Sequence, residues 1–154
     1  MGFFAYSAWD NTTRMHYTLA ARQEGPLAKN ELFSLQIALN GTSGQLVGAS
    51  SFVDFPPPLL QTDITYVFTR AGLVYIAFAQ AVMLTVSPQT GAVLNTTSLL
   101  PSADANPIDG LASTFDEVTG TFWVNAVGTG GLYLHRCALP GRGDASGGLR
   151  AGQQ

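Results

Sequence analysis

The residues in this chain whose types most directly suggest chemistry are three asparagines that begin Asn-x-Ser/Thr sequons, the acceptors of N-linked glycans. They are Asn11, Asn40 and Asn95. Composition alone accounts for about one such match. All three fall at expected hairpin turns or at turn exits, where a glycan would project into solvent, although asparagine also suits turns for conformational reasons. For a chain that passes through a eukaryotic secretory pathway, the sequence predicts N-linked glycans at these sites.

A second short motif lies at Arg142, Gly143 and Asp144, the tripeptide that integrin ligands use for adhesion. It stands in a segment made largely of Gly, Arg, Ser, Ala and Gln, which also reads as a plain linker. Because a three-residue match arises easily by chance, this is a weak adhesion motif.

Acid–base and metal-binding groups are sparse. His16 and His135 are the only histidines, and both fall in expected strands beside aromatic residues. Neither belongs to a readable Ser-His-Asp arrangement, and the motif Gly-x-Ser-x-Gly is missing. Asp104, Asp109 and Asp116 do not have the spacing of an EF-hand calcium loop, and aspartate is ordinary in turns. We therefore expect no catalytic residue, no metal site and no cofactor.

Cys137 is the only cysteine, which excludes an internal disulfide and any multi-cysteine metal site. Its neighbours Leu134, Ala138 and Leu139 indicate a buried strand position, where a thiol packs as a small apolar group. A disulfide to another chain is the alternative.

The elements that position these residues recur along the chain. Leu32–Leu35, Val82–Val86 and Leu132–His135 each read as a short strand, and Phe33, Met83 and Tyr133 follow one another at a spacing of about 50 residues. A period of roughly 40–50 residues filled by strands is typical of β-propeller blades. The fold class predicted is all-β, with antiparallel propeller-like repeats, about three blades and an incomplete ring. A β-sandwich built from the same strands is the alternative.

The turn signals divide the chain into units of about 1–55, 62–100 and 108–140, which together make one domain, followed by a flexible Gly-rich tail at 141–154. Within the first unit, residues 23–30 are expected to form a polar loop between two strands. The apolar run Ala71–Val86 is too short for a membrane-spanning helix, which needs roughly 20 residues. Its β-branched and aromatic residues favour two strands instead.

Two hairpin segments, 86–94 and 115–124, resemble the repeats of quinoprotein-like and YVTN-type β-propellers, in which an Asp-x-x-Thr-Gly-x-Val hairpin joins two strands. Residues 40–47 form a looser copy. The resemblance implies the propeller fold class. The tryptophan-docking positions of true quinoprotein repeats are missing, so it implies no quinone site.

Charged residues make up 11% of the chain, against about 25% in typical soluble domains. A surface so poor in charge suggests contact with a partner or coverage by glycans. The net charge of −3 and the scattered basic residues offer no patch for nucleic acid. About three blades are also too few for a closed propeller of roughly four to eight. We expect other protein chains to pair with the edge strands, at Phe3–Asp10 and Leu132–Leu139.

The function predicted from these features is a non-catalytic, extracellular or lumenal, glycosylated β-repeat module that acts as a structural or protein-interaction component of a larger assembly. One alternative is part of a propeller enzyme or ligand-binding propeller whose axial site other blades complete. A cytoplasmic scaffold with accidental sequons is another.

Overall fold

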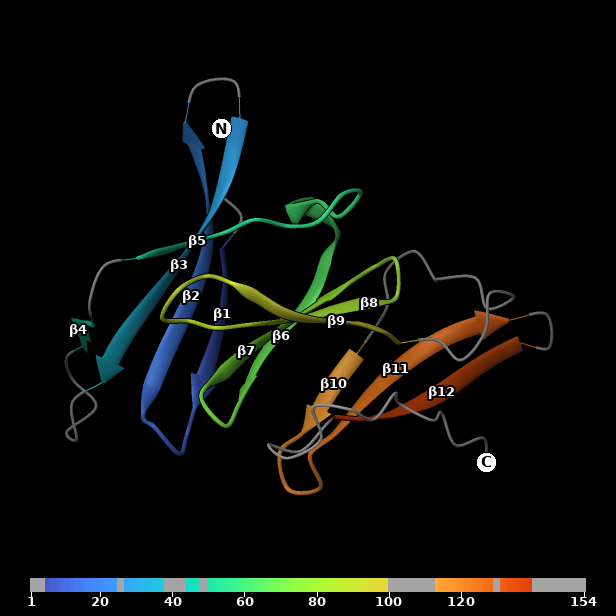
Figure 1. The fold of residues 1–154 in the computed structure, drawn as a ribbon. Coiled ribbons are helices and arrows are strands. Elements are labelled where there is room, and N and C mark those ends of the chain that lie inside the picture. The colour runs from blue at the N-terminus through green and yellow to red at the C-terminus, as the bar shows by residue number, and fades with distance from the viewer. Residues whose placement is uncertain are drawn as a thin grey trace.

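The described residues of the chain form three antiparallel β-sheets that follow one another along the sequence (Figure 1). The structure, a computed structural model, describes residues 5–24, 27–37, 44–47, 50–99, 113–128 and 131–139. The N-terminal sheet contains β1 (Ala5–Asp10), β2 (Met15–Glu24) and β3 (Leu27–Ile37), with β4 (Gly44–Leu46) and β5 (Ser51–Val53) both paired to β3. The middle sheet orders β6 (Ile64–Arg70), β7 (Leu73–Phe78), β8 (Val82–Val86) and β9 (Val93–Ser98), after a short 3-10 helix, η1 (Gln61–Asp63). The C-terminal sheet contains β10 (Ser113–Asp116), β11 (Thr121–Gly128) and β12 (Gly131–Ala138). The predicted all-β, propeller-like class is confirmed.

The repeat is visible in the strand order. Phe33, Met83 and Tyr133 lie in β3, β8 and β12, each the third strand of its sheet. Counted from the first hairpin of each sheet, however, the residue that matches Phe33 is Leu84 in β8 and His135 in β12. The 50-residue spacing therefore identifies the correct strands but misses the register by one and two residues.

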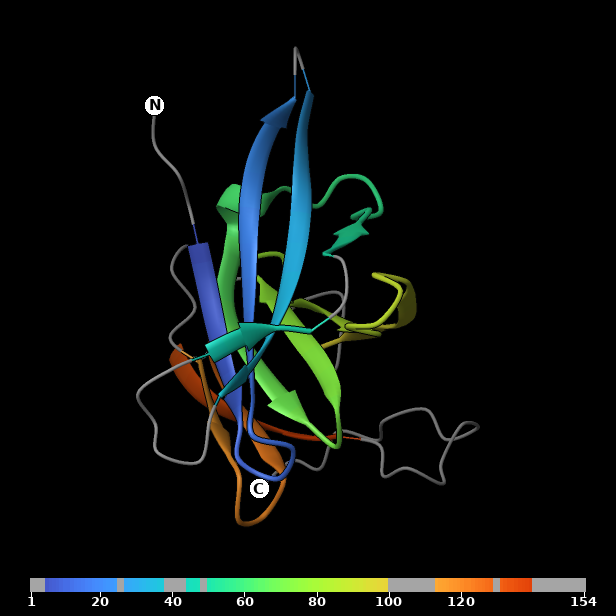
Figure 2. The ribbon, with the colours of Figure 1, turned by 90° about the vertical axis from the view of Figure 1, so that its left-hand side faces the viewer.

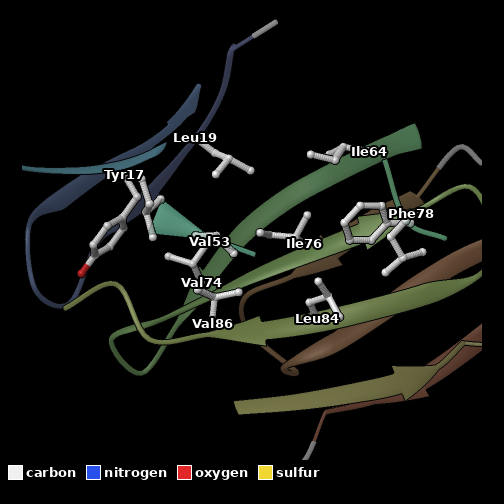
Figure 3. Packing of buried hydrophobic residues seen from close by; sticks show 11 residues of the cluster. Tyr17, Leu19, Val53, Ile64, Val74, Ile76, Phe78, Leu84 and Val86 are labelled. Atoms are coloured by element: carbon white, nitrogen blue, oxygen red, sulfur yellow. The ribbon is translucent and has the colours of Figure 1, made fainter. Parts of the chain in front are cut away.

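The middle sheet buries both of its faces. Side chains alternate between the two faces of a strand, so neighbours along β7 point to opposite sides. Val74, Ile76 and Phe78 pack in a first cluster with residues of the N-terminal sheet such as Leu19 and Leu32 (Figure 3). Tyr75 and its neighbour Ala77 pack instead in a second cluster with residues of the C-terminal sheet. A sheet covered on both sides by neighbouring sheets is the packing expected of an internal blade.

Aromatic rings make the second junction. The ring of Phe68 on β6 stacks on Phe115 of β10, with centroids 4.3 Å apart, and on Phe122 of β11 at 5.2 Å. Tyr75, which belongs to the middle sheet itself, stacks on the Phe68 ring with centroids 4.9 Å apart. Phe122 is fully buried, so this stack anchors the C-terminal sheet to the middle one.

The first strands of adjacent sheets lie beside one another. The Tyr6 hydroxyl of β1 donates to the carbonyl of Ile64 in β6 at 3.2 Å. The Thr69 hydroxyl of β6 donates to the carbonyl of Trp9 in β1 at 2.8 Å. The edge of β1 that does not pair with β2 is therefore close to the middle sheet.

The predicted loop at residues 23–30 is wrong. β2 continues to Glu24 and β3 begins at Leu27, and the pairing that joins Leu19 to Leu32 runs on as far as Glu24 and Leu27. Figure 2 shows this pair as a long ribbon that extends beyond the rest of the sheet. The backbone pairing between β2 and β3 begins among core residues. It continues into a polar segment because such pairing does not require apolar side chains.

The apolar run at 71–86 forms the end of the β6–β7 turn, β7 and β8, as predicted. Its first hairpin turns at Ala71 and Gly72, both with positive φ, which is the geometry of a two-residue turn. Among the residues that the structure describes, no helix is long and apolar enough to cross a membrane.

Candidate functional site

The outer face of the N-terminal sheet carries exposed aromatic surface. In β1, Tyr6 and Ala8 face the middle sheet, so alternation turns Trp9 to the opposite side. The Trp9 side chain is 36% exposed. His16 lies directly opposite it on β2, and Phe33 of β3 lies partly exposed on the same face. We call Trp9, His16 and Phe33 the N-terminal outer face.

The first turns of the N-terminal and C-terminal sheets have the same hydrogen bonds, which shows which residues of the two sheets are equivalent. The Asp10 carboxylate accepts hydrogen bonds from the backbone N–H groups two and three residues later, at 2.9 and 3.1 Å. Asp116 does the same at the first turn of the C-terminal sheet, at 2.9 and 3.3 Å. Trp9 and Phe115, each directly before its aspartate, therefore hold equivalent places. Phe115 uses that place to stack on the neighbouring sheet, whereas Trp9 remains exposed.

The C-terminal sheet presents a matching outer face. Phe122 packs toward the middle sheet, so Trp123, the next residue along β11, points to the other side. Its cross-strand neighbour on β10 is Thr114, which is exposed. Trp123 holds the position that Tyr75 holds in the middle sheet, where Tyr75 stacks on Phe68 and packs in the cluster shared with the C-terminal sheet. We call Thr114 and Trp123 the C-terminal outer face.

Polar links repeat at each junction near the first turns. An Asp10 carboxylate oxygen accepts a hydrogen bond from the backbone N–H of Gly72 in the middle sheet at 3.2 Å. The Arg70 guanidinium, at the same strand end one sheet later, donates to the carbonyl of Gly120 in the C-terminal sheet at 3.3 Å. The last residues of β1 and β6 thus each reach the first turn of the following sheet.

Asp116 is the next member of this series. The Thr119 hydroxyl donates to its carboxylate at 2.6 Å, and together with the backbone N–H groups of Thr119 and Val118 this holds the pKa of Asp116 below its usual range. The turn position that Gly120 fills in the C-terminal sheet, with φ of 65°, is filled by Arg14 in the N-terminal sheet, with φ of 56°. The strand-end position thus carries a negative charge in the C-terminal sheet, at Asp116, and the turn position carries a positive charge in the N-terminal sheet, at Arg14.

A cleft of about 360 Å³ lies between the N-terminal sheet and the β8–β9 turn. Its lining includes Met15, Tyr17, Ser34, Ser51 and Gln89. Burial, reinforced by the nearby Asp10 charge, raises the pKa of Tyr17, so its hydroxyl stays protonated in neutral solution. The described lining offers hydroxyl and amide groups and no group that exchanges protons near neutral pH, so the cleft suits hydrogen bonding rather than acid–base chemistry.

The predicted glycan sites are distributed and form no common site. Asn11 is exposed in the first turn of the N-terminal sheet. Asn95 is also exposed, but it lies within the edge strand β9 rather than at a turn exit, and its amide donates to the Thr97 hydroxyl at 3.2 Å. Asn40 and the Arg142-Gly143-Asp144 motif lie outside the described residues.

The remaining candidates are not brought together. His16 lies on the N-terminal outer face, where its Nδ1 is 3.4 Å from the Thr18 hydroxyl. His135 and Cys137 lie in β12, and only their backbone is described. Asp104 and Asp109 fall outside the described residues, and Asp116 shapes a turn. No group of three or more potential metal ligands occurs in the described part of the chain.

The sequence interpretation did not identify Trp9 and Trp123 as site residues. The available signal was the recurrence of an aromatic residue directly before a turn aspartate, at Trp9-Asp10 and Phe115-Asp116. The segments that resemble the turn at Asp116 in sequence do not mark first turns in the described structure: residues 44–46 form β4, and residues 86–94 join β8 to β9.

No family model and no curated protein matches the sequence of this chain. The structure has a distant match to the crystal structure of glutaminyl cyclase from Myxococcus xanthus. The TM-score is 0.39 and the identity 16%, over 81% of this chain and 68% of that one. This match assigns no family.

Proposed function

We propose that this protein is a non-catalytic β-repeat module, built from repeats of the quinoprotein-like and YVTN type, that acts as a structural or interaction component of a larger assembly. The observation that carries the proposal is the exposed Trp9, which holds the place where the equivalent Phe115 packs on a neighbouring sheet. The partner is a β-sheet of another protein chain that covers the N-terminal outer face.

The face suits this role better than the strand edge. The edge of β1 that does not pair with β2 lies beside β6, where Tyr6 and Thr69 make hydrogen bonds between the sheets. A partner strand added there would have to displace the middle sheet. Packing on Trp9 and Phe33 leaves those contacts intact and removes apolar surface from water.

The setting that fits this module is extracellular or lumenal, with N-linked glycans on Asn11, Asn40 and Asn95. Exposure of the Asn11 and Asn95 side chains supports that proposal, because a glycan needs an accessible amide. The Arg142-Gly143-Asp144 motif would add adhesion if the segment is accessible in the assembly.

Photo-crosslinking tests the proposal. A benzophenone amino acid replaces Trp9 in the native cells, and a matched control replaces Leu94, an exposed apolar residue on the outermost strand of the middle sheet. We expect adducts from position 9 that mass spectrometry maps to a β-strand of a protein partner, and none from position 94. A folded protein whose position 9 gives no protein adduct beyond the control would overturn the proposal.

A further inference from the structure

We infer that the sheet covering the N-terminal outer face is the C-terminal sheet of a second copy of this chain, so that two copies close a ring of six sheets head to tail. This inference rests on the proposed function and names its partner. Four residues carry this pairing by the places that they hold in the repeat: Trp9, Trp123, Asp116 and Arg14.

The two outer faces complement each other by position. Inside the chain, Phe68 stacks on Phe115 across the junction between the middle and C-terminal sheets, and Tyr75 stacks on Phe68 from within the middle sheet. All three residues belong to the cluster at that junction. At the proposed junction between copies, Thr114 and Trp123 hold the places of Phe68 and Tyr75. Trp9 holds the place of Phe115. The junction between copies would therefore place the two tryptophans at the positions that Tyr75 and Phe115 hold in the aromatic cluster of the internal junction.

Charge is complementary at the same junction. Within the chain, Asp10 and Arg70 each reach the first turn of the following sheet. Asp116 is the next residue in that series, and the turn that it would meet belongs to the N-terminal sheet of the second copy. In that turn, Arg14 holds the place of Gly120, which receives the Arg70 hydrogen bond. An aspartate thus meets an arginine, whereas a random pairing of faces has no reason to match charge.

The number of sheets allows closure. A closed propeller contains roughly four to eight blades, and two copies of the three sheets that the described residues form lie within that range. In a two-fold dimer each copy supplies both faces once, so the contact of Trp9 with the partner's Trp123 occurs twice and no outer face remains exposed.

The test measures molecular mass by sedimentation at tens of micromolar, with the wild-type chain and the variants Trp9→Arg and Trp123→Arg. The wild type is expected at twice the 16.2 kDa chain mass, and each variant at the mass of one chain. Leu94→Arg is the matched control, since it adds the same charge on the outermost strand of the middle sheet, and it should remain dimeric. Far-ultraviolet circular dichroism confirms that each variant is folded.

Mixing the two variants gives the decisive result. A heterodimer of one Trp9→Arg chain and one Trp123→Arg chain has one junction free of substitutions. An equimolar mixture of the two variants should therefore contain dimers, although neither variant dimerises alone. A dimer that survives Trp123→Arg but not Trp9→Arg would show that two N-terminal faces meet instead, and would overturn the inference. A wild-type chain that sediments as a monomer would also overturn it. Crosslinks from position 9 to a different protein would then leave the proposed function standing, whereas their absence would reject both.

Discussion

Replacing Gly91 by alanine should destabilise the protein much more than the same change at Gly72, although both residues have similar positive φ, 72° and 76°. A side chain in this left-handed region costs about 1–2 kcal/mol. At Gly72 a Cβ atom would meet nothing within 4 Å, so the backbone term is the whole expected loss. At Gly91 the Cβ atom would lie 2.0 Å from the carbonyl oxygen of Phe52 in β5.

That contact is between two backbone segments and cannot be relieved by turning a side chain. The β8–β9 turn and β5 must move apart by more than 1 Å to reach an ordinary contact near 3.4 Å. Such overpacking costs about 1–3 kcal/mol beyond the backbone term, which brings the expected loss for Gly91→Ala to about 2–5 kcal/mol. Separation would also weaken the hydrogen bond from the Ser51 hydroxyl to the Gln89 carbonyl, now 3.1 Å.

The assay is urea-induced unfolding of the wild type and the two variants at one protein concentration, with the free energy of unfolding extrapolated to water. Gly120→Ala provides an intermediate case, because its Cβ atom would lie 2.7 Å from the guanidinium of Arg70, the far end of a flexible side chain that can shift more easily than backbone. The expected loss in the free energy of unfolding increases from Gly72→Ala through Gly120→Ala to Gly91→Ala. A Gly91→Ala variant no less stable than Gly72→Ala would refute the close approach of the β8–β9 turn to β5.

Three further predictions follow from the packing, the turns and the sequons. Phe122→Ala should lower the free energy of unfolding by about 3–5 kcal/mol because it empties a fully buried site, whereas Val118→Ala, at a 96% exposed position, should change it by no more than about 0.5 kcal/mol; urea unfolding measures both. The folded pKa of Asp116 is lowered, so the stability it adds is present above its unfolded pKa near 3.8 and is lost as the pH falls through the folded value. The difference between wild type and Asp116→Asn should therefore shrink between pH 7 and pH 2, and a difference independent of pH would contradict the assignment. Asn11→Gln and Asn95→Gln should each remove one glycan from the chain expressed in a eukaryotic secretory pathway, as read by intact mass, and a wild-type mass equal to the bare polypeptide would contradict both sites.

The strands could be predicted from the sequence because turn chemistry marks their ends. Gly72 and Gly120 close turns that require positive φ, and the intervening residues alternate or are β-branched. The register was harder to obtain. Phe33 corresponds to Leu84 rather than Met83, and a slip of one residue moves a side chain to the opposite face of the sheet.

The outer faces could not be predicted from the sequence for a different reason. Alternation along β1 separates Trp9 from Ala8, but it does not reveal which of the two faces a neighbouring sheet covers. That distinction depends on contacts between residues about 60 positions apart, such as the hydrogen bond from Thr69 to the Trp9 carbonyl. It became visible only when the turns at Asp10 and Asp116 could be superposed by their hydrogen bonds.

The burial of both faces of the middle sheet has a consequence for biosynthesis. Leu19 and Leu32 of the N-terminal sheet leave the ribosome first, but the residues that cover them, such as Ile76 and Leu84, are translated roughly 50 positions later. At about 5–20 residues per second, this delay lasts roughly 3–10 s. During that interval the nascent chain presents a branched-aliphatic strand surface that a chaperone can bind, and synthesis of β7 and β8 ends the exposure.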